Sequence, residues 1–250
     1  MPHPSDIVPL EPMPVDWRRA LAIVAHPDDV EYGTAGAVAE WTAAGKDVAY
    51  VLVTRGEAGI DGIDPAESAR IRQGEQLASA AAVGVREVEF LDHQDGVVEE
   101  GPALRADLAA AIRRHRPELL ITINHRETWG GRAWNTPDHR IVGRAVLDAA
   151  GDAGNRWIFR DQLGEGGLET WGGVRWVAVA GSPEPTHAQA VGEAALERAV
   201  ASLAEHRAYI AALSDLPPEE YARDLHRQAA AVVAERFGGV PCVGFEVFPR

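Results

Sequence analysis

Three histidines, His26, His93 and His125, follow short apolar runs, and His139 comes later, after the last of these runs; each has a carboxylate within two residues. His26 is the clearest case, because the segment His26-Pro27-Asp28-Asp29 comes directly after the apolar run 20–25. Imidazole nitrogens and carboxylate oxygens are ligands of zinc in proteins. His26 and Asp29 are three residues apart across a tight turn, close enough to bind one ion together. His139, from a distant segment, is the best candidate for a third ligand.

Three protein ligands with one open position are typical of a catalytic zinc rather than a structural one. The open position holds water, whose pKa falls towards about 7 on zinc. Asp28 precedes a ligand in the chain, so we expect it to lie near that water and act as general base. The pattern predicts metal-assisted hydrolysis of a carbonyl compound by one zinc ion. Ligand type favours zinc, and other divalent transition metals remain open.

The segments that position these residues alternate between strand and helix. Apolar runs predict strands over residues 20–25, 47–54, 87–91 and 118–124. Helical patterns lie over residues 33–44, 65–83, 104–115 and 137–150. Four alternations predict βαβ units and a mainly parallel, doubly wound α/β sheet.

After Gly151 the alternation weakens, and we expect a helical C-terminal elaboration. Strands are predicted over 174–180 and 242–248, and helices over 189–213 and 218–236. The glycine-rich segment 164–173 is predicted to be a flexible loop that could cover the site as a lid. We expect a single domain over residues 1–250, with an irregular, proline-rich arm over 1–17.

Ligands of an open parallel sheet bind outside the carboxyl ends of its strands. Arg55 and Asp95 each follow a predicted strand, and Trp134 precedes His139, where its ring could stack on a sugar. We predict these three residues and His187 as substrate-binding. A turn explains the first two equally well, and burial in the core explains Trp134 equally well. Two further residues in a helix, Arg72 and Glu75, fit a surface ion pair across one helical turn.

The composition excludes several classes of partner. A net charge of −14 and a pI near 5.0 argue against binding nucleic acid or an anionic membrane. One cysteine, Cys242, excludes an intrachain disulfide and a thiolate metal cage. No stretch approaches the roughly 18 apolar residues needed to span a bilayer. We expect a cytoplasmic protein that acts on a small molecule.

The segment Ala25–Glu31, AHPDDVE, resembles the signature of the PIG-L/LmbE-like zinc-dependent N-acetylglucosaminyl deacetylases. Further segments in the order of that family are TRGEAG at 54–59, Arg72 with Glu75, Gly84, and PDHR at 137–140. The resemblance covers about residues 20–145. It implies a Rossmann-like fold and the removal of N-acetyl groups, mostly from glucosamine-containing substrates. By position it implies zinc ligands at His26, Asp29 and His139, with Asp28 as general base.

One position departs from the family, which often carries His-x-Asp-His before this helix, the first histidine helping to stabilise the oxyanion. Here that position is Thr136, a good N-cap residue ahead of Pro137. An oxyanion donor must then come from elsewhere, with His187, His125 and Arg55 as candidates, or zinc acts alone.

Two reactions remain open for the same site. The first is deacetylation of a small, sugar-like N-acetylated substrate; the second is an amidase reaction on a larger N-acyl substrate such as a thiol conjugate. Nucleotide binding would need G-x-G-x-x-G after the first strand, where the chain has HPDD instead, and two carboxylates there would repel a pyrophosphate. A third possibility is a binding protein that has lost its activity. Only Thr136, which replaces the family's histidine, supports it.

Overall fold

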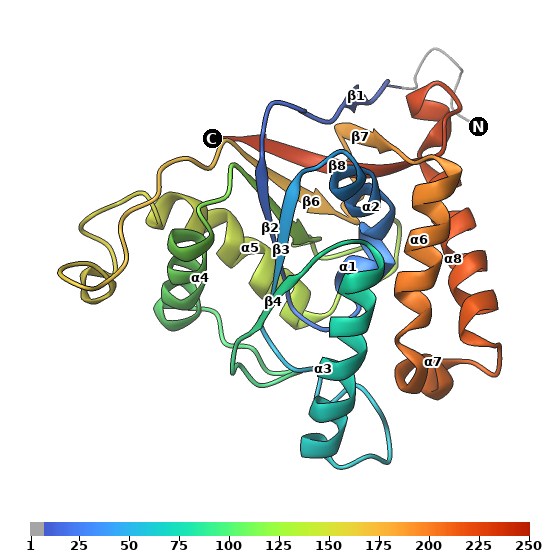
Figure 1. Cartoon of the computed structure of the whole chain (residues 1–250), viewed down its shortest axis with the longest axis horizontal. Helices are drawn as coiled ribbons and strands as arrows, with labels where there is room; N and C mark the ends of the chain where they lie inside the picture. Colours follow the sequence, from blue (N-terminus) through green and yellow to red (C-terminus); the bar gives the residue numbers. More distant parts are fainter. Residues whose placement is uncertain (1–7) are drawn as a thin grey trace.

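The computed structural model describes residues 8–250, and in this part of the chain eight strands form one sheet (Figure 1). The strands are β1 (Glu11–Pro12), β2 (Arg19–Val24), β3 (Asp47–Leu52), β4 (Glu87–Phe90), β5 (Leu119–Ile123), β6 (Trp176–Ala180), β7 (His187–Ala190) and β8 (Cys242–Pro249). Their spatial order is β1-β7-β8-β6-β5-β2-β3-β4. Every pairing is parallel except those of β8, which runs antiparallel between β6 and β7.

Helices connect the strands and cover both faces of the sheet. They are α1 (Asp29–Gly33), α2 (Ala35–Ala43), α3 (Pro65–Ala82), α4 (Pro102–His115), α5 (Pro137–Asp152), α6 (Glu193–Ala204), α7 (Arg207–Leu213) and α8 (Pro218–Val232), with short 3-10 turns η2 (Arg160–Gln162) and η3 (Ala234–Phe237). Four of them, α3, α4, α5 and α8, begin with proline, whose fixed φ suits the first turn and whose missing N–H costs nothing there.

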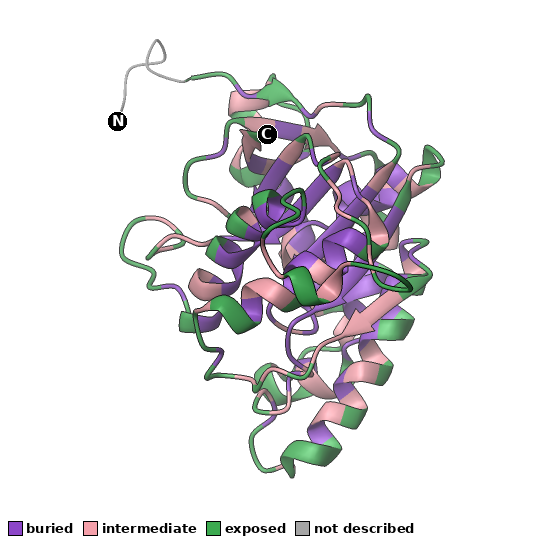
Figure 2. Cartoon of the chain, turned by 90° about the vertical axis from the view of Figure 1, so that its left-hand side faces the viewer, coloured by how far each residue is buried: buried purple, intermediate pink, exposed green. Residues whose placement is uncertain are grey.

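The core has two layers because side chains alternate along each central strand. Ala22 and Val24 of β2 pack with α2, α3 and α6 on one face, and Leu21 and Ile23 pack with α4 and α5 on the other. Figure 2 shows the buried residues gathered in the strands and on the inner sides of the helices. Helix α8 packs on α6 and forms an outer layer. Strands buried on both faces explain the continuous apolar runs of the sequence.

The predicted fold class, a doubly wound and mainly parallel sheet with C-terminal helices, is confirmed. Two predicted boundaries are wrong. The helix expected over 189–213 is interrupted, since residues 187–190 form β7 against β8 and two helices follow, α6 and α7. The arm expected over 1–17 contains β1, which pairs with β7, while residues 1–7 lie outside the described part.

None of the helices described over residues 8–250 has the length and apolar character needed to cross a bilayer.

Candidate active site

The turn between β2 and α1 is closed by its own side chains. The Asp29 carboxylate oxygen Oδ2 accepts the backbone N–H of His26 at 2.9 Å. Asp28, between them, has a φ of 93°, a left-handed conformation that residues other than glycine rarely adopt. The turn therefore holds His26, Asp28 and Asp29 in a fixed arrangement at the carboxyl end of a central strand.

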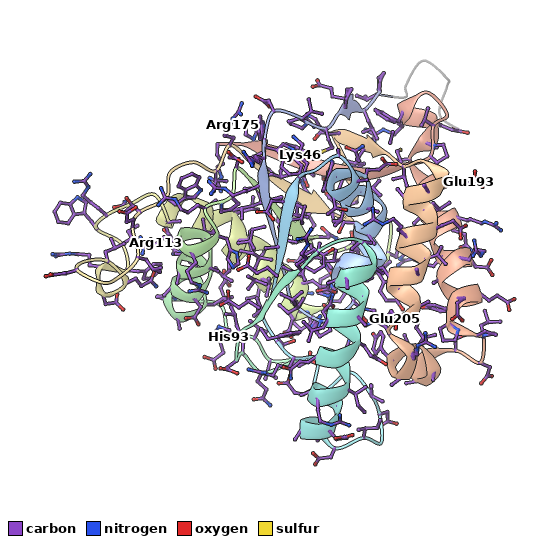
Figure 3. The ribbon with its side chains drawn as sticks, viewed as in Figure 1. Lys46, His93, Arg113, Arg175, Glu193 and Glu205 are labelled. Carbon is purple, nitrogen blue, oxygen red and sulfur yellow. The ribbon has the colours of Figure 1, made fainter. Side chains whose placement is uncertain are left out.

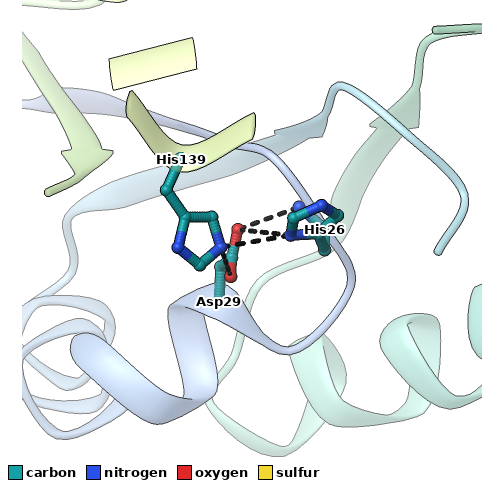
Figure 4. Close-up of side chains that lie close together, drawn as sticks. All are labelled: His26, Asp29 and His139. Atoms are coloured by element: carbon teal, nitrogen blue, oxygen red, sulfur yellow. Dashed lines mark hydrogen bonds and ion pairs between the residues drawn. The ribbon is translucent and has the colours of Figure 1, made fainter. Parts of the chain in front are cut away.

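His139 reaches this turn from the first turn of α5, which lies close against the end of β5. Gly143, one turn further on, allows this approach, because a Cβ there would lie 2.5 Å from the carbonyl oxygen of Ile123. His26 Nδ1 lies 3.1 Å from His139 Nε2, and His139 Nε2 lies 3.0 Å from Asp29 Oδ1. Figure 4 shows the three side chains pointing towards one another. The structure thus brings together His26, Asp29 and His139.

The outward nitrogen of His26 faces two carboxylates. His26 Nε2 lies 3.0 Å from Asp95 Oδ1 and 3.2 Å from Asp138 Oδ2. Asp138 is itself fixed, because its oxygens accept the backbone N–H groups of Gly96 and Val98 at 2.7 and 3.2 Å. A carboxylate accepts hydrogen bonds, so in the neutral imidazole that binds a metal Nε2 carries the proton and Nδ1 offers the lone pair. This arrangement is common for metal-binding histidines.

Asn135 sets the tautomer of His139 in the same way. The amide nitrogen of Asn135 donates to the carbonyls of Asn124 and Arg126 at 2.7 and 3.0 Å. The other end of the amide, Oδ1, must therefore face His139 Nδ1, which lies 3.2 Å away. An amide oxygen accepts, so Nδ1 carries the proton of His139 and Nε2 is bare. Asn135 is completely buried, which keeps this orientation fixed.

Two bare imidazole nitrogens and a carboxylate therefore face one point, and their lone pairs repel unless a positive charge lies between them. Tetrahedral zinc with bonds of about 2.0–2.1 Å separates its ligand atoms by roughly 3.3 Å. Here His139 Nε2 lies 3.1 Å from His26 Nδ1 and 3.0 Å from Asp29 Oδ1, and one ligand atom from each of the three residues lies within 4.8 Å of the other two. The donor set and its spacing fit a divalent transition-metal ion.

The pKa shifts reflect the same electrostatics. Burial opposes the charged form of His26, but hydrogen bonds to three carboxylates outweigh it and raise the pKa of His26 well above its ordinary value. Burial would raise the pKa of Asp29, but the imidazole of His139 beside it holds that pKa below its usual range. Burial raises the pKa of Asp28 to about 6, and the charge of Arg72 partly offsets that effect.

These groups lie in the wall of a cavity of about 670 Å³. Polar residues from the strand ends make one side: His26, Asp28, Asp29, Arg72, Asp95, Asp138 and His139. Aromatic and aliphatic side chains make much of the rest, among them Trp129 and Ile123, and from α7 and α8 Tyr209, Leu213 and Tyr221. The cavity thus combines a compact polar centre with an apolar wall, as small-molecule sites do.

Arg72 is buried beneath this cavity and holds the turn. Its Nη2 donates to the carbonyl of Pro27 at 2.5 Å and to Asp28 Oδ2 at 2.9 Å. The ring of Tyr209 covers its guanidinium at 4.1 Å. Glu75 is not its partner, since that carboxylate accepts the backbone N–H of Ala208. The surface ion pair considered from the sequence is therefore wrong.

Comparison with known proteins agrees with this geometry. The model of the PIG-L family, described as GlcNAc-PI de-N-acetylase, matches residues 21–150. The chain belongs to the PIG-L family. The matched region contains β2 to α5, and with them all three residues that converge in Figure 4. The resemblance carried by the AHPDDVE segment is confirmed.

Two curated relatives in this family share 32% identity with the chain. Diacetylchitobiose deacetylase of Thermococcus kodakarensis aligns over 56% of this chain and 51% of its own length. The 1D-myo-inositol 2-acetamido-2-deoxy-alpha-D-glucopyranoside deacetylase of Kineococcus radiotolerans aligns over 67% of this chain and 53% of its own. The chain thus spans about half the length of the curated relatives it matches.

A solved structure extends the likeness to the C-terminal part. N,N'-diacetylchitobiose deacetylase from Pyrococcus horikoshii superposes with a TM-score of 0.80, covering 94% of this chain and 85% of the other at 22% identity. At this identity the comparison shows the fold alone. The fold, including α6 to β8, is that of the PIG-L neighbour.

Of the residues predicted to bind substrate, one lines the cavity and the others do not. Asp95 lines the cavity. Arg55 does not line it, and instead bonds Asp92 and Gln73 at 2.6 and 2.8 Å. Trp134 is 66% exposed and lies over the guanidinium of Arg140 at 5.0 Å, outside the lining.

Three other histidines considered from the sequence, His187, His125 and His93, do not line the cavity. His187 lies on β7, where its Nδ1 is 2.8 Å from Thr186 Oγ1. His125 packs its ring against Phe248. His93, labelled in Figure 3, follows β4 and pairs with Asp107 at 3.0 Å. His187, His125 and Arg55 were the candidates for an oxyanion donor, and the geometry brings none of them to the cavity.

Thr136 stands at the N-cap of α5, but its side chain makes no capping hydrogen bond. The backbone N–H of Thr136 is bonded instead to Asn135 Oδ1 at 2.9 Å. Thr136 lines the cavity. The expectation that its side chain caps the helix is wrong, although Thr136 does occupy the N-cap position.

The segment 164–173 is not a lid. Figure 1 shows it beside α4, at the left, and no residue of it lines the cavity. Trp171 donates to the carbonyl of Pro117 at 2.7 Å, and Glu169 pairs with Arg116. These contacts attach the segment to the end of α4, and the cavity wall is completed instead by α7 and α8.

The sequence did not single out Asn135, Asp138, Gln76 or Tyr209. A signal existed for Asp138, which precedes His139 directly and is an acid in the first turn of a helix. Gln76 lies four residues after Arg72, on the same side of α3. Tyr209 gave no signal, because its contact with Arg72 depends on the packing of α7.

Proposed function

We propose that this chain is a zinc-dependent hydrolase that removes the N-acetyl group of a small, glucosamine-containing substrate. In this proposal His26, Asp29 and His139 hold the metal, and Asp28 is the general base. The single observation that carries the proposal is the convergence of two bare imidazole nitrogens and a carboxylate at one cavity wall. The setting of that site in a PIG-L chain supplies the substrate class.

The comparisons favour the deacetylase over the amidase alternative. Both relatives described above are named as deacetylases, and their names denote N-acetylated glucosamine units. A sugar ring fits a wall that offers aromatic faces from Trp129 and Tyr209. Among the residues predicted to bind substrate, Asp95 is the one that the cavity geometry supports.

In the proposed hydrolysis of the amide, the metal, Asp28 and Arg72 have different roles. A zinc ion held by His26, Asp29 and His139 would supply a nucleophilic water near neutral pH and polarise the substrate carbonyl. Arg72 engages Asp28 Oδ2, so the other oxygen of that carboxylate is left to take a proton from the water. The water oxygen adds to the acetyl carbonyl carbon, and as the C–N bond breaks Asp28 gives that proton to the amine nitrogen, so the products are acetate and the free amino sugar.

Cys242, the one cysteine, is buried and free, which supports a reducing compartment such as the cytoplasm.

Metal analysis joined to an assay of amine release tests the proposal. The purified chain is assayed with N-acetylglucosamine, with N,N'-diacetylchitobiose and with an N-acylated thiol conjugate, before and after chelation. We expect one zinc ion per chain, amine release from the amino-sugar substrates, loss of activity on chelation, and recovery on adding zinc. Activity that survives complete removal of metal, or a chain that binds no divalent ion, refutes it.

A further inference from the structure

Asp28 has an uncommon backbone conformation that its surroundings must maintain. Its φ of 93° and ψ of −22° put a residue with a Cβ in the left-handed region. Such conformations persist only where neighbouring groups over-determine them. Asp28 is 5% exposed, so water contributes little to holding it. The groups that fix this residue must therefore be sought in the protein.

Gln76 binds the backbone of Asp28 from the face of α3. The backbone N–H of Asp28 donates to Gln76 Oε1 at 2.9 Å, and both residues are buried. Arg72, one helical turn earlier, binds the Asp28 side chain. Two residues of α3 therefore hold Asp28: Gln76 binds its main chain, and Arg72 binds its carboxylate.

The amide of Gln76 has only one orientation available. Its Nε2 donates to Glu31 Oε1 at 2.9 Å, and the same oxygen accepts the Ser79 hydroxyl at 2.6 Å. An amide flip would place the Gln76 oxygen against Glu31 and its NH₂ against the N–H of Asp28. Glu31 is completely buried, so neither mismatch can be relieved by water.

These hydrogen bonds continue from Ser79 to Ser202 of α6. The Ser79 hydroxyl lies 2.8 Å from the hydroxyl of Ser202, which also lies 3.0 Å from the carbonyl of Ser79. Ser79 and Ser202 are completely buried. A continuous chain of hydrogen bonds thus runs from α6 through α3 and Glu31 to the main chain at Asp28.

We propose that Gln76 is a positioning residue for Asp28, which it holds in the conformation that presents the carboxylate to the site. Glu31 fixes the direction of the Gln76 amide. The role assigned to Asp28 rests on the proposed function. The effect of Gln76 on the Asp28 backbone does not, so it can be measured separately.

Hydrogen exchange of the full chain tests the backbone contact without any substrate. Gln76→Leu removes the acceptor of the Asp28 N–H, and we expect faster deuterium uptake in a peptide over residues 26–32. A peptide from β5 should exchange as in the wild type. Gln162→Leu is the matched control, because both ends of the Gln162 amide are also bonded, accepting from Arg113 and donating to the carbonyl of Ala106, both in α4 and outside the cavity lining.

Kinetics test the consequence for the reaction. We expect Gln76→Leu to lower kcat by about 100-fold, the cost of a misplaced catalytic group, with KM and bound zinc unchanged. Combining Gln76→Glu with Glu31→Gln keeps an acceptor for the Asp28 N–H and reverses the direction of the hydrogen bond between positions 76 and 31, and we expect it to recover most of the rate. Should Gln76→Leu not fold, Gln76→Asn, one methylene too short to reach both partners, takes its place.

The outcomes separate the two proposals. Unchanged exchange over residues 26–32 in the Gln76 variant overturns the positioning role, whatever the activity. Faster exchange with wild-type kcat shows that the backbone contact exists but does not affect the reaction. This outcome also overturns the positioning role of Gln76. A wild-type chain that releases no amine refutes the proposed function, while the exchange result still decides whether Gln76 holds Asp28.

Discussion

Replacing Asn135 by leucine removes the group that fixes the tautomer of His139. In the wild type the amide oxygen accepts from His139 Nδ1 because the amide nitrogen is committed to the carbonyls of Asn124 and Arg126. Without that acceptor the imidazole is free to place its proton on Nε2, the atom that faces His26 and Asp29. A protonated nitrogen has no lone pair for a metal, so we expect weaker zinc binding.

The size of the effect follows from the hydrogen bonds lost. Removing a partner of a metal-binding histidine lowers metal affinity by typically about 10- to 100-fold, or roughly 1.4–2.7 kcal/mol. The two buried carbonyls that lose their donor cost about 1–3 kcal/mol each in the metal-free protein. For a domain of this size we expect a fall in Tm of at least about 4 °C.

Zinc affinity is measured by competition with a chromophoric chelator near neutral pH, and Tm by circular dichroism on the metal-free protein. Asn155→Leu is the control, since the Asn155 side chain is exposed and bonds only the nearby N–H of Trp157. A variant at position 135 with a lowered Tm but wild-type zinc affinity would refute the tautomer argument while leaving the packing argument intact.

Three further predictions concern single residues. Asp28→Asn should keep its zinc and lose at least about 100-fold in kcat; full amine release by this variant would remove the base assignment. Arg72→Leu leaves the buried Asp28 carboxylate without its ion pair, so urea unfolding should show a loss of about 3–5 kcal/mol, and a loss below about 1 kcal/mol would contradict this. Burial lowers the pKa of His226 to about 4. As the pH falls below about 6.5, His226 therefore becomes protonated in the unfolded chain while it stays neutral in the folded chain. Stability should therefore fall by up to roughly 3 kcal/mol as the pH drops from 6.5 to 4, and His226→Leu should flatten this part of the profile; an unchanged slope would count against it.

The sequence located the centre of the site because topology alone decides where strand ends meet. The residues that follow β2 and those that begin α5 must come together once β2 and β5 are neighbours in a parallel sheet. The groups around them were harder to predict, since the direction of Asn135 depends on two carbonyls of a loop that no local pattern specifies. Residue types at strand ends predict a site, and packing decides which of them face it.

Arg55 and Trp134 illustrate the same limit. Both lie in the expected segments, yet Arg55 pairs with Asp92 and Trp134 lies over Arg140 on the surface. The interruption at β7 has a different cause. Residues 187–190 read HAQA, with no strong strand former among them, and their pairing with β8 overrides that local preference. A partner more than fifty residues away in the chain cannot be read from a local window.

The position of β8 has a consequence for how the protein is made. Residues 242–249 lie between β6 and β7, so a growing polypeptide on the ribosome has a gap in its sheet until this late segment leaves the exit tunnel. Until then β7 and β1 have no neighbour to join them to β6, and the edge of β6 is open to other nascent chains. The sheet can therefore close only after these eight residues have been made.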